Sequence, residues 1–184
     1  MKLFLGLFVS VLLLITALAI WAWSGRYNVA ATVPHWDLIA WFMEEVRNRS
    51  IKFHSQEIQS PSLKDSKLIK TGFNEYDAMC RLCHGAPGYE PTELARGLYP
   101  KPPDLVSQGV QQRSNAELYW VVKNGIKMTG MPAFGPTHNE DELSSVVAFL
   151  RRMPGMQAKD YEVLVREAGQ HKEGEDHHHA SKKH

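Results

Sequence analysis

Cysteine is scarce in this sequence: its 184 residues contain only Cys80 and Cys83. Two cysteines cannot form a four-cysteine metal site. An excess of one charge is also missing, since 21 basic and 20 acidic residues leave a formal net charge of +1. This balance gives no support to nucleic-acid binding through a basic surface. The useful signals are therefore local, and the chain divides into an apolar start, a mixed middle and a polar end.

The apolar start lacks charge altogether from Leu3 to Trp23. About 20 such residues suffice to span a bilayer as a helix, whereas the apolar core of a signal peptide usually has about 7 to 15. Two tryptophans close the run and Arg26 follows, as expected at a membrane interface. We interpret it as an uncleaved signal anchor. The alternative is a cleaved signal peptide with a site at Ala17-Leu18-Ala19; both place the remaining chain across the membrane.

The two cysteines stand in the stretch Cys80-Arg81-Leu82-Cys83-His84. This C-x-x-C-H spacing is the attachment signature of c-type haem, in which the thiols form thioethers and the histidine becomes an axial ligand of the iron. A redox cysteine pair would need an alternating strand and helix pattern around it. Half of a zinc site would need a second Cys/His pair at a definite spacing, and the sequence has neither. A single C-x-x-C-H motif predicts one covalent haem c.

A second iron ligand is expected downstream, where residues 124–135 form a glycine-rich stretch with Met128 and Met131. The order of C-x-x-C-H and a later Gly-Met-Pro-Ala-Phe-Gly loop resembles the class I cytochromes c, over roughly residues 66–157. In that family the methionine of Gly-Met-Pro is the distal ligand, so the resemblance implies Met131. The predicted haem-binding residues are Cys80, Cys83, His84 and Met131, with His84 and Met131 as the iron ligands.

Further residues fit the same resemblance. Gly72, Tyr76 and Cys80 recur every four residues, so they share one helix face. In class I cytochromes c a small and an aromatic residue on this helix cross a C-terminal helix, which here corresponds to residues 146–150. The segment Pro102-Pro103-Asp104-Leu105 is similar to the proline segment whose backbone carbonyl supports the proximal histidine. Which proline provides that carbonyl stays open at this point.

The sequence predicts four parts: a transmembrane signal anchor (1–25), an amphipathic helix with a linker (26–65), the haem domain (66–157), and a polar, histidine-rich, disordered tail (158–184). The amphipathic helix should run from Pro34, in its first turn, to about His54. Its apolar stripe could pack on the haem domain, lie on the membrane or dock on a partner subunit. Residues 55–66 form the linker.

Within the haem domain we expect helices at Leu68–Leu82 and Ala116–Asn124, and a third that begins after Asn139 and ends before Pro154. Ser114 and Glu117 form a capping-box pattern for the second helix, and Asn139 should cap the third. The long stretch from His84 to Arg113 is rich in proline and glycine and should wrap around the haem. The overall class is therefore all-α.

Other residues offer weaker alternatives. His35, His54 and His138 could ligate iron, but surface or capping roles explain them equally well. Trp120 or Tyr119 could reach a haem propionate, although core packing is the simpler role. The run His177-His178-His179 could bind a metal or simply be solvated. A ring of basic residues flanking the haem loops could receive an acidic partner: Arg96, Lys101, Arg113, Lys123 and Lys127.

Together these features predict a membrane-tethered, mono-haem cytochrome c, an electron carrier and not an enzyme. It would transfer single electrons in a respiratory chain, between a quinol-oxidising complex and a terminal reductase or oxidase. The haem domain would lie on the periplasmic or equivalent side of the cytoplasmic membrane. Two alternatives remain: a fixed subunit of a membrane oxidoreductase, and a haem sensor or peroxidase-like enzyme in which Met131 leaves the iron.

Overall fold

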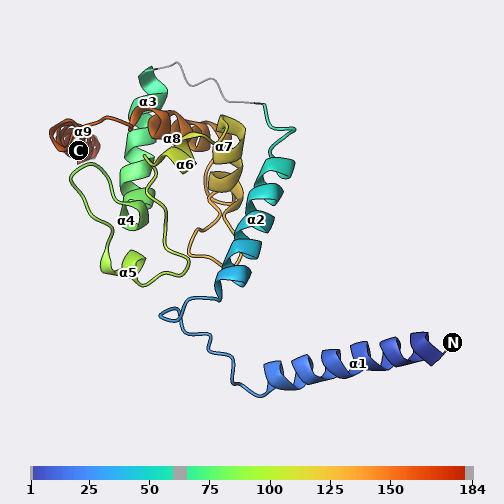
Figure 1. Ribbon diagram of the computed structural model, residues 1–184. Helices are drawn as coiled ribbons and strands as arrows, with labels where there is room; N and C mark the ends of the chain where they lie inside the picture. Colours follow the sequence, from blue (N-terminus) through green and yellow to red (C-terminus); the bar gives the residue numbers. More distant parts are fainter. Residues whose placement is uncertain (1, 60–65, 181–184) are drawn as a thin grey trace. The chain divides into compact units, whose positions relative to one another are not determined.

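The computed structural model describes residues 2–59 and 66–180, and the regular elements in these ranges are helices (Figure 1). The chain divides into two compact units, Met1–Pro34 and His35–His184. The first unit contains α1 (Lys2–Trp23), a helix of 22 residues in which every described side chain is exposed. The second contains the remaining helices. The predicted all-α class is confirmed.

The first long helix of the haem region is continuous but not uniform. It begins as α3 (Ser66–Glu75), loosens into one π-helical turn, η1 (Tyr76–Cys80), and ends as α4 (Arg81–His84). Single π-turns inside α-helices occur frequently at functional sites, and this one ends on the first cysteine of the C-x-x-C-H motif. The other helices of this unit are α2 (Asp37–His54), α5 (Glu93–Arg96), α6 (Gln108–Gln111), α7 (Asn115–Asn124), α8 (Glu140–Arg152) and α9 (Ala158–Ala180).

Two helices begin where the sequence predicts. At α7, the Ser114 hydroxyl accepts from the Glu117 N–H (3.1 Å) and the Glu117 carboxylate accepts from the Ser114 N–H (2.7 Å). Asn139 and Glu142 form the same reciprocal pair at α8. Each pair satisfies N–H groups that have no partner within the helix. The carboxylates also lie at the positive end of the helix dipole.

The core is built where α3 crosses α8 (Figure 1). Phe73 of α3 and Tyr76 of η1 pack against Phe149 of α8, with ring centroids 5.5 and 5.3 Å from that of Phe149. Gly72 lies at the crossing itself: a Cβ built there would lie 1.9 Å from the backbone oxygen of Ser145. The expected crossing of a small and an aromatic residue with the C-terminal helix is confirmed. It places the helix that carries Cys80 directly on the core.

We expect Gly72→Ala to destabilise the domain by about 3 kcal/mol or more, the upper part of the range for overpacked cores. The clash is with backbone, so the two helices must separate to relieve it. Gly109→Ala is the matched control, because a Cβ at this helical glycine meets nothing within 4 Å. Thermal unfolding of both variants measures the difference. Equal melting temperatures for the two variants would show that the helix crossing tolerates a Cβ.

Two boundaries differ from the sequence prediction. The haem region does not end at residue 157, because Tyr161 of α9 is fully buried and its ring packs against Phe73 and Tyr89. Leu164, Val165 and Ala168 follow at helical spacing and join the core. The predicted disorder of the tail is therefore wrong for residues 158–169, and the structure continues α9 to Ala180. Residues 181–184, and 60–65 of the predicted linker, lie outside the described residues.

The extra helix begins three residues later than predicted. Trp36, with an extended backbone, is the N-cap of α2, so Pro34 precedes the helix and is not in its first turn. Asp37 occupies the first position instead, where its negative charge suits the helix dipole. The C-terminal half of α2 packs on α7, and Ile51 is buried there. The predicted apolar stripe lies mainly in the other half and is exposed, since Ile39, Met43 and Val46 are 38, 56 and 48% exposed. The buried contact is therefore made by Ile51 and not by the stripe.

Candidate haem site

The two cysteines lie on consecutive turns at the end of the long helix formed by α3, η1 and α4. Cys80 closes the π-turn and is buried, whereas Cys83 lies in α4 and is half-buried. Residues three apart on a helix share a face, so both thiols are presented on one side. Burial, followed by the neighbouring Cys83 and Glu75, raises the pKa of Cys80 to about 12. A thiol with this pKa stays protonated at neutral pH, which argues against thiolate redox chemistry.

His84 is held in a defined orientation. Its Nδ1 lies 2.8 Å from the backbone oxygen of Pro103. A carbonyl only accepts, so Nδ1 carries the proton and donates, which leaves the lone pair of Nε2 free for a metal. Burial lowers the pKa of His84, opposed by the Pro103 contact and by Asp104. A neutral imidazole is the form that binds iron. The sequence did not decide which proline carbonyl supports the histidine, and the structure shows that it is the carbonyl of Pro103.

The end of the motif is locked by backbone contacts. The buried Tyr76 hydroxyl donates to the Gly85 oxygen at 2.6 Å, and Gly85 adopts the left-handed conformation with φ +69°. Burial raises the pKa of Tyr76 well above its ordinary value, so the hydroxyl remains a donor. Thr92 donates from both its N–H and its hydroxyl to the oxygen of Leu82, at 3.1 and 2.8 Å. These bonds hold the turn in which His84 lies.

The methionine loop folds back onto the end of α7. Gly125 stops this helix with φ +65°, and a Cβ there would lie 2.7 to 2.8 Å from backbone atoms of residues 131–133. Ile126 N–H donates to the Met131 oxygen at 3.1 Å, and Met131 N–H donates to the Thr129 hydroxyl at 3.1 Å. The backbone of Met131 is therefore bonded on both sides. Only glycine permits this close approach at position 125.

The two methionines of the loop differ in exposure. Met128 is 94% exposed and has a positive φ of 58°, whereas Met131 is half-buried. A ligand must face the interior to reach a buried iron, so this geometry favours Met131 over Met128. The loop also packs across the site: a Cβ at Gly130 would lie 2.6 Å from the side chain of Leu98.

A second set of contacts, which the sequence did not predict, supports the motif from the outside. Arg81, within C-x-x-C-H, forms an ion pair with Asp77 (2.7 Å) and places its guanidinium 4.7 Å from the centre of the Tyr89 ring. The Tyr161 hydroxyl donates to the same Asp77 carboxylate at 2.9 Å. The spacing of Asp77 and Arg81 was a visible i,i+4 signal. The contribution of Tyr161 was not visible, because 84 residues separate it from Asp77.

The alternative histidines have other partners. The His35 ring packs edge-on against Tyr99, and the His54 ring stacks on Trp120 with centroids 5.9 Å apart. His138 lies before α8, where its Nδ1 is 2.8 Å from the Thr137 hydroxyl. Tyr119 is buried in the core, as its simpler role predicts. The side chains of His177-His178-His179 lie outside the described side chains.

The predicted basic ring is only partly available. Arg113 is half-buried and donates to Asn48 of α2 at 2.6 Å, so it serves an internal contact. Lys123 pairs with Glu140 at 3.0 Å. Arg96, Lys101 and Lys127 are exposed. Two of the five charges are thus paired within the same chain, and the docking ring stays a prediction.

The arrangement has the features of a class I c-type cytochrome: a C-x-x-C-H helix on a helical core, a supported histidine and a methionine loop on the following helix. Residues 67–150 match the family model described as Cytochrome C oxidase, cbb3-type, subunit III. No curated protein matches the sequence. The matched segment is a class I c-type cytochrome domain.

This class carries covalent haem c, and the residues present fit the group. The Cys80 thiol, whose pKa is raised by burial, suits thioether formation rather than thiolate binding of a metal. The imidazole has one nitrogen tied to Pro103 and one free. When bound, haem iron supplies reversible one-electron redox chemistry. The protein is thus a haem-based electron-transfer protein.

Proposed function

We propose that this chain is a membrane-tethered, mono-haem cytochrome c that transfers single electrons in a respiratory chain. Cys80 and Cys83 would hold the haem through thioethers, and His84 and Met131 would be its axial ligands. Donor and acceptor would be a quinol-oxidising complex and a terminal reductase or oxidase. The haem domain would face the periplasmic or equivalent side of the cytoplasmic membrane.

The observation that carries this proposal is the bond between His84 Nδ1 and the Pro103 oxygen. This bond orients the His84 ring so that Nε2 can bind iron. The hydrogen bonds of the Met131 backbone hold the second proposed ligand, a thioether sulfur, on a loop later in the chain. Two protein ligands leave no coordination position for oxygen or peroxide. A neutral thioether opposite histidine also raises the reduction potential. Both effects favour electron transfer over catalysis.

The membrane tether is supported by α1. This helix has 22 residues, an 18-residue window with a mean hydropathy of 2.8, and no buried side chain. At 1.5 Å per residue it is about 33 Å long, enough for the roughly 30 Å hydrocarbon core of a bilayer. A cleaved signal sequence passes the same test, and the N-terminal sequence of the purified protein distinguishes the two. An intact N-terminal sequence, in a protein that stays in the membrane during alkaline extraction, supports the anchor.

An optical spectrum of the membrane fraction, oxidised and reduced, tests the electron-transfer proposal. We expect a low-spin c-type spectrum that carbon monoxide does not change, with the charge-transfer band of methionine bound to ferric iron. The physical reason is that both axial positions are occupied. A high-spin spectrum, or one that carbon monoxide changes, would contradict the proposal and favour a sensor or peroxidase-like enzyme.

A second candidate is a fixed haem subunit of a membrane oxidoreductase. The description of the matching family model, which names an oxidase subunit, favours it. Blue-native electrophoresis of mildly solubilised membranes separates the two candidates. A free carrier should migrate near its own mass of 20.9 kDa plus detergent. Co-migration of the haem stain with a large assembly would favour the subunit.

A further inference from the structure

Helix α2 has an inner face that is attached firmly to the haem region. Ile51 is 2% exposed, and the His54 ring stacks nearly parallel on Trp120 of α7, with 14° between the planes. Near the start of the helix, the His35 N–H donates to the Tyr99 hydroxyl at 2.9 Å. Contacts at both ends hold α2 in place against the haem region.

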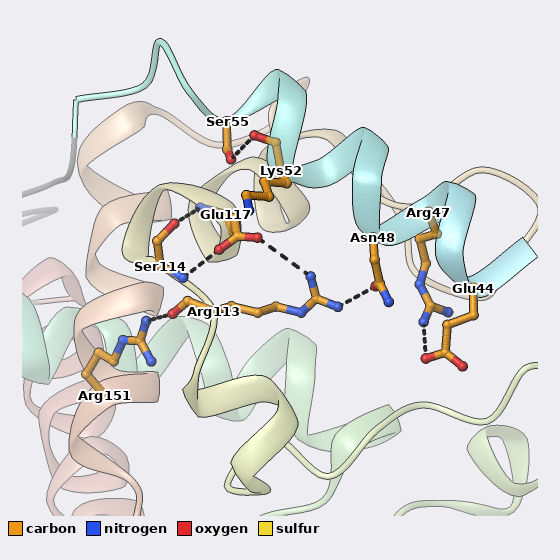
Figure 2. Close-up of polar contacts among 9 residues, drawn as sticks. All are labelled: Glu44, Arg47, Asn48, Lys52, Ser55, Arg113, Ser114, Glu117 and Arg151. Carbon is orange, nitrogen blue, oxygen red and sulfur yellow. Dashed lines mark hydrogen bonds and ion pairs between the residues drawn. The ribbon is translucent and has the colours of Figure 1, made fainter. Parts of the chain in front are cut away.

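Figure 2 shows the polar part of this attachment. Arg113 reaches from the segment before α7 and donates to the Asn48 side chain at 2.6 Å. The same guanidinium lies 4.0 Å from Glu117 of α7, and the backbone oxygen of Arg113 accepts from Arg151 of α8. The guanidinium that holds α2 is therefore itself held by two helices of the haem domain. Movement of α2 alone would break these bonds.

The opposite face of α2 is apolar, yet exposed. Leu38, Phe42, Val46 and Phe53 are 71, 52, 48 and 67% exposed. Their spacings of four, four and seven residues place them on one side of a helix. We call these four residues the outer face. Glu45 and Arg49, an ion pair at 2.6 Å, fall on the same side of the helix. An exposed face of this kind, largely apolar and with its charges paired, marks an interaction site for another molecule or a membrane.

Four charged side chains of α2 are paired within the helix. Glu44 pairs with Arg47 at 2.9 Å (Figure 2), and Glu45 with Arg49 at 2.6 Å. Across Asp37–His54 the acidic and basic residues are equal in number, with histidine neutral. The helix thus offers no excess charge with which to attract a strongly charged partner protein. A neutral, apolar occupant matches it better.

The short connection between α1 and α2 favours the membrane over other neutral, apolar partners. Only residues 24–36 separate the end of α1 from the start of α2. Thirteen residues reach at most about 45 Å when fully extended, so a membrane spanned by α1 is always within reach of α2. Confinement of this kind raises the effective concentration of the membrane at α2 far above that of any freely diffusing partner.

We propose that the outer face of α2 lies in the headgroup and acyl-chain interface of the bilayer that α1 spans. This inference rests on the membrane anchor proposed above. Aromatic and aliphatic side chains that dominate one face, with an arginine whose long side chain can reach the headgroups, fit the pattern of interfacial helices. Because α2 is attached rigidly to α7, the haem domain has two attachments to the membrane and a restricted orientation. Tyr99 contacts His35, and the neighbouring Leu98 lies against Gly130 of the methionine loop, so this loop lies close to the start of α2.

Cysteine accessibility in the full chain tests this proposal. Phe42→Cys and, as a second site on the same face, Val46→Cys are compared with the control Glu44→Cys, an exposed position off the outer face. Each haem-loaded protein is placed singly in phosphatidylcholine nanodiscs and reacted with a charged, water-soluble maleimide. We expect residues 42 and 46 to react roughly tenfold or more slowly than residue 44, because the reagent does not enter the bilayer. Equal rates at all three positions would overturn the proposal.

A second measurement identifies what covers the outer face. Benzophenone-maleimide is attached at position 42, the sample is irradiated, and the mass of the product is determined. A lipid-sized addition supports the proposal. An adduct with a second copy, or with another membrane protein when native membranes are used, would overturn it in favour of a protein interface. Leu12→Cys in α1 tests the anchor itself: reaction of residue 12 with the charged maleimide means that the anchor has failed, whatever α2 does.

Discussion

Replacing Met131 by alanine should convert the haem from six-coordinate low spin to an open, carbon-monoxide-binding form. The potential should fall by on the order of 0.1 V or more, within the roughly 0.8 V range over which axial ligands set haem potentials. The reason is the loss of the neutral thioether that stabilises the ferrous state. Redox titration and the optical spectrum, with and without carbon monoxide, measure both effects.

Met128→Ala is the matched control for this prediction. It removes the same side chain three residues earlier in the same loop, at a position that is 94% exposed. We expect its spectrum and potential to equal those of the parent. If the parent spectrum survived in Met131→Ala and was lost in Met128→Ala, the ligand assignment would have to be reversed.

The double variant Cys80→Ser with Cys83→Ser should lose covalent haem completely. Serine is close to cysteine in size, so the core around Cys80, which is 8% exposed, should pack nearly as before. A hydroxyl does not form the thioether, however. Haem staining after denaturing electrophoresis measures the loss, and immunoblotting of the same gel confirms that the polypeptide is present.

The single variants Cys80→Ser and Cys83→Ser complete this experiment. Each keeps one thiol, so residual staining in both single variants with none in the double variant would assign one thioether to each cysteine. Staining of the double variant at the parent level would contradict the attachment site. It would leave the cytochrome class intact, because the match of residues 67–150 is independent of this experiment.

Much of the fold was predictable because its signals are local. Both capping boxes, at Ser114 and at Asn139, formed as expected, since each requires only residues three apart. The glycine that stops α7 and the shared face of Gly72, Tyr76 and Cys80 also follow from short-range geometry. The start of α2 was misplaced because Pro34 and Asp37 are both suitable for a first helical turn.

The errors arose where distant segments meet. The haem region was ended at residue 157 because the resemblance to the class I cytochromes c extends no further. Tyr161 is nevertheless buried against Phe73 and hydrogen-bonded to Asp77, partners that composition cannot reveal. Arg113 was considered only as one member of a possible docking ring, and its bond to Asn48, 65 residues away, was likewise not visible in the sequence.

The sequence by itself determined the class of this protein, since C-x-x-C-H followed by Gly-Met-Pro specifies covalent haem chemistry within a few adjacent residues. It also determined the helical class and the presence of an apolar segment long enough to span a membrane. Only the tertiary structure decided which carbonyl orients His84, why position 72 must be glycine, and which face of α2 stays uncovered. These properties depend on contacts between residues far apart in the chain, and no local pattern encodes such contacts.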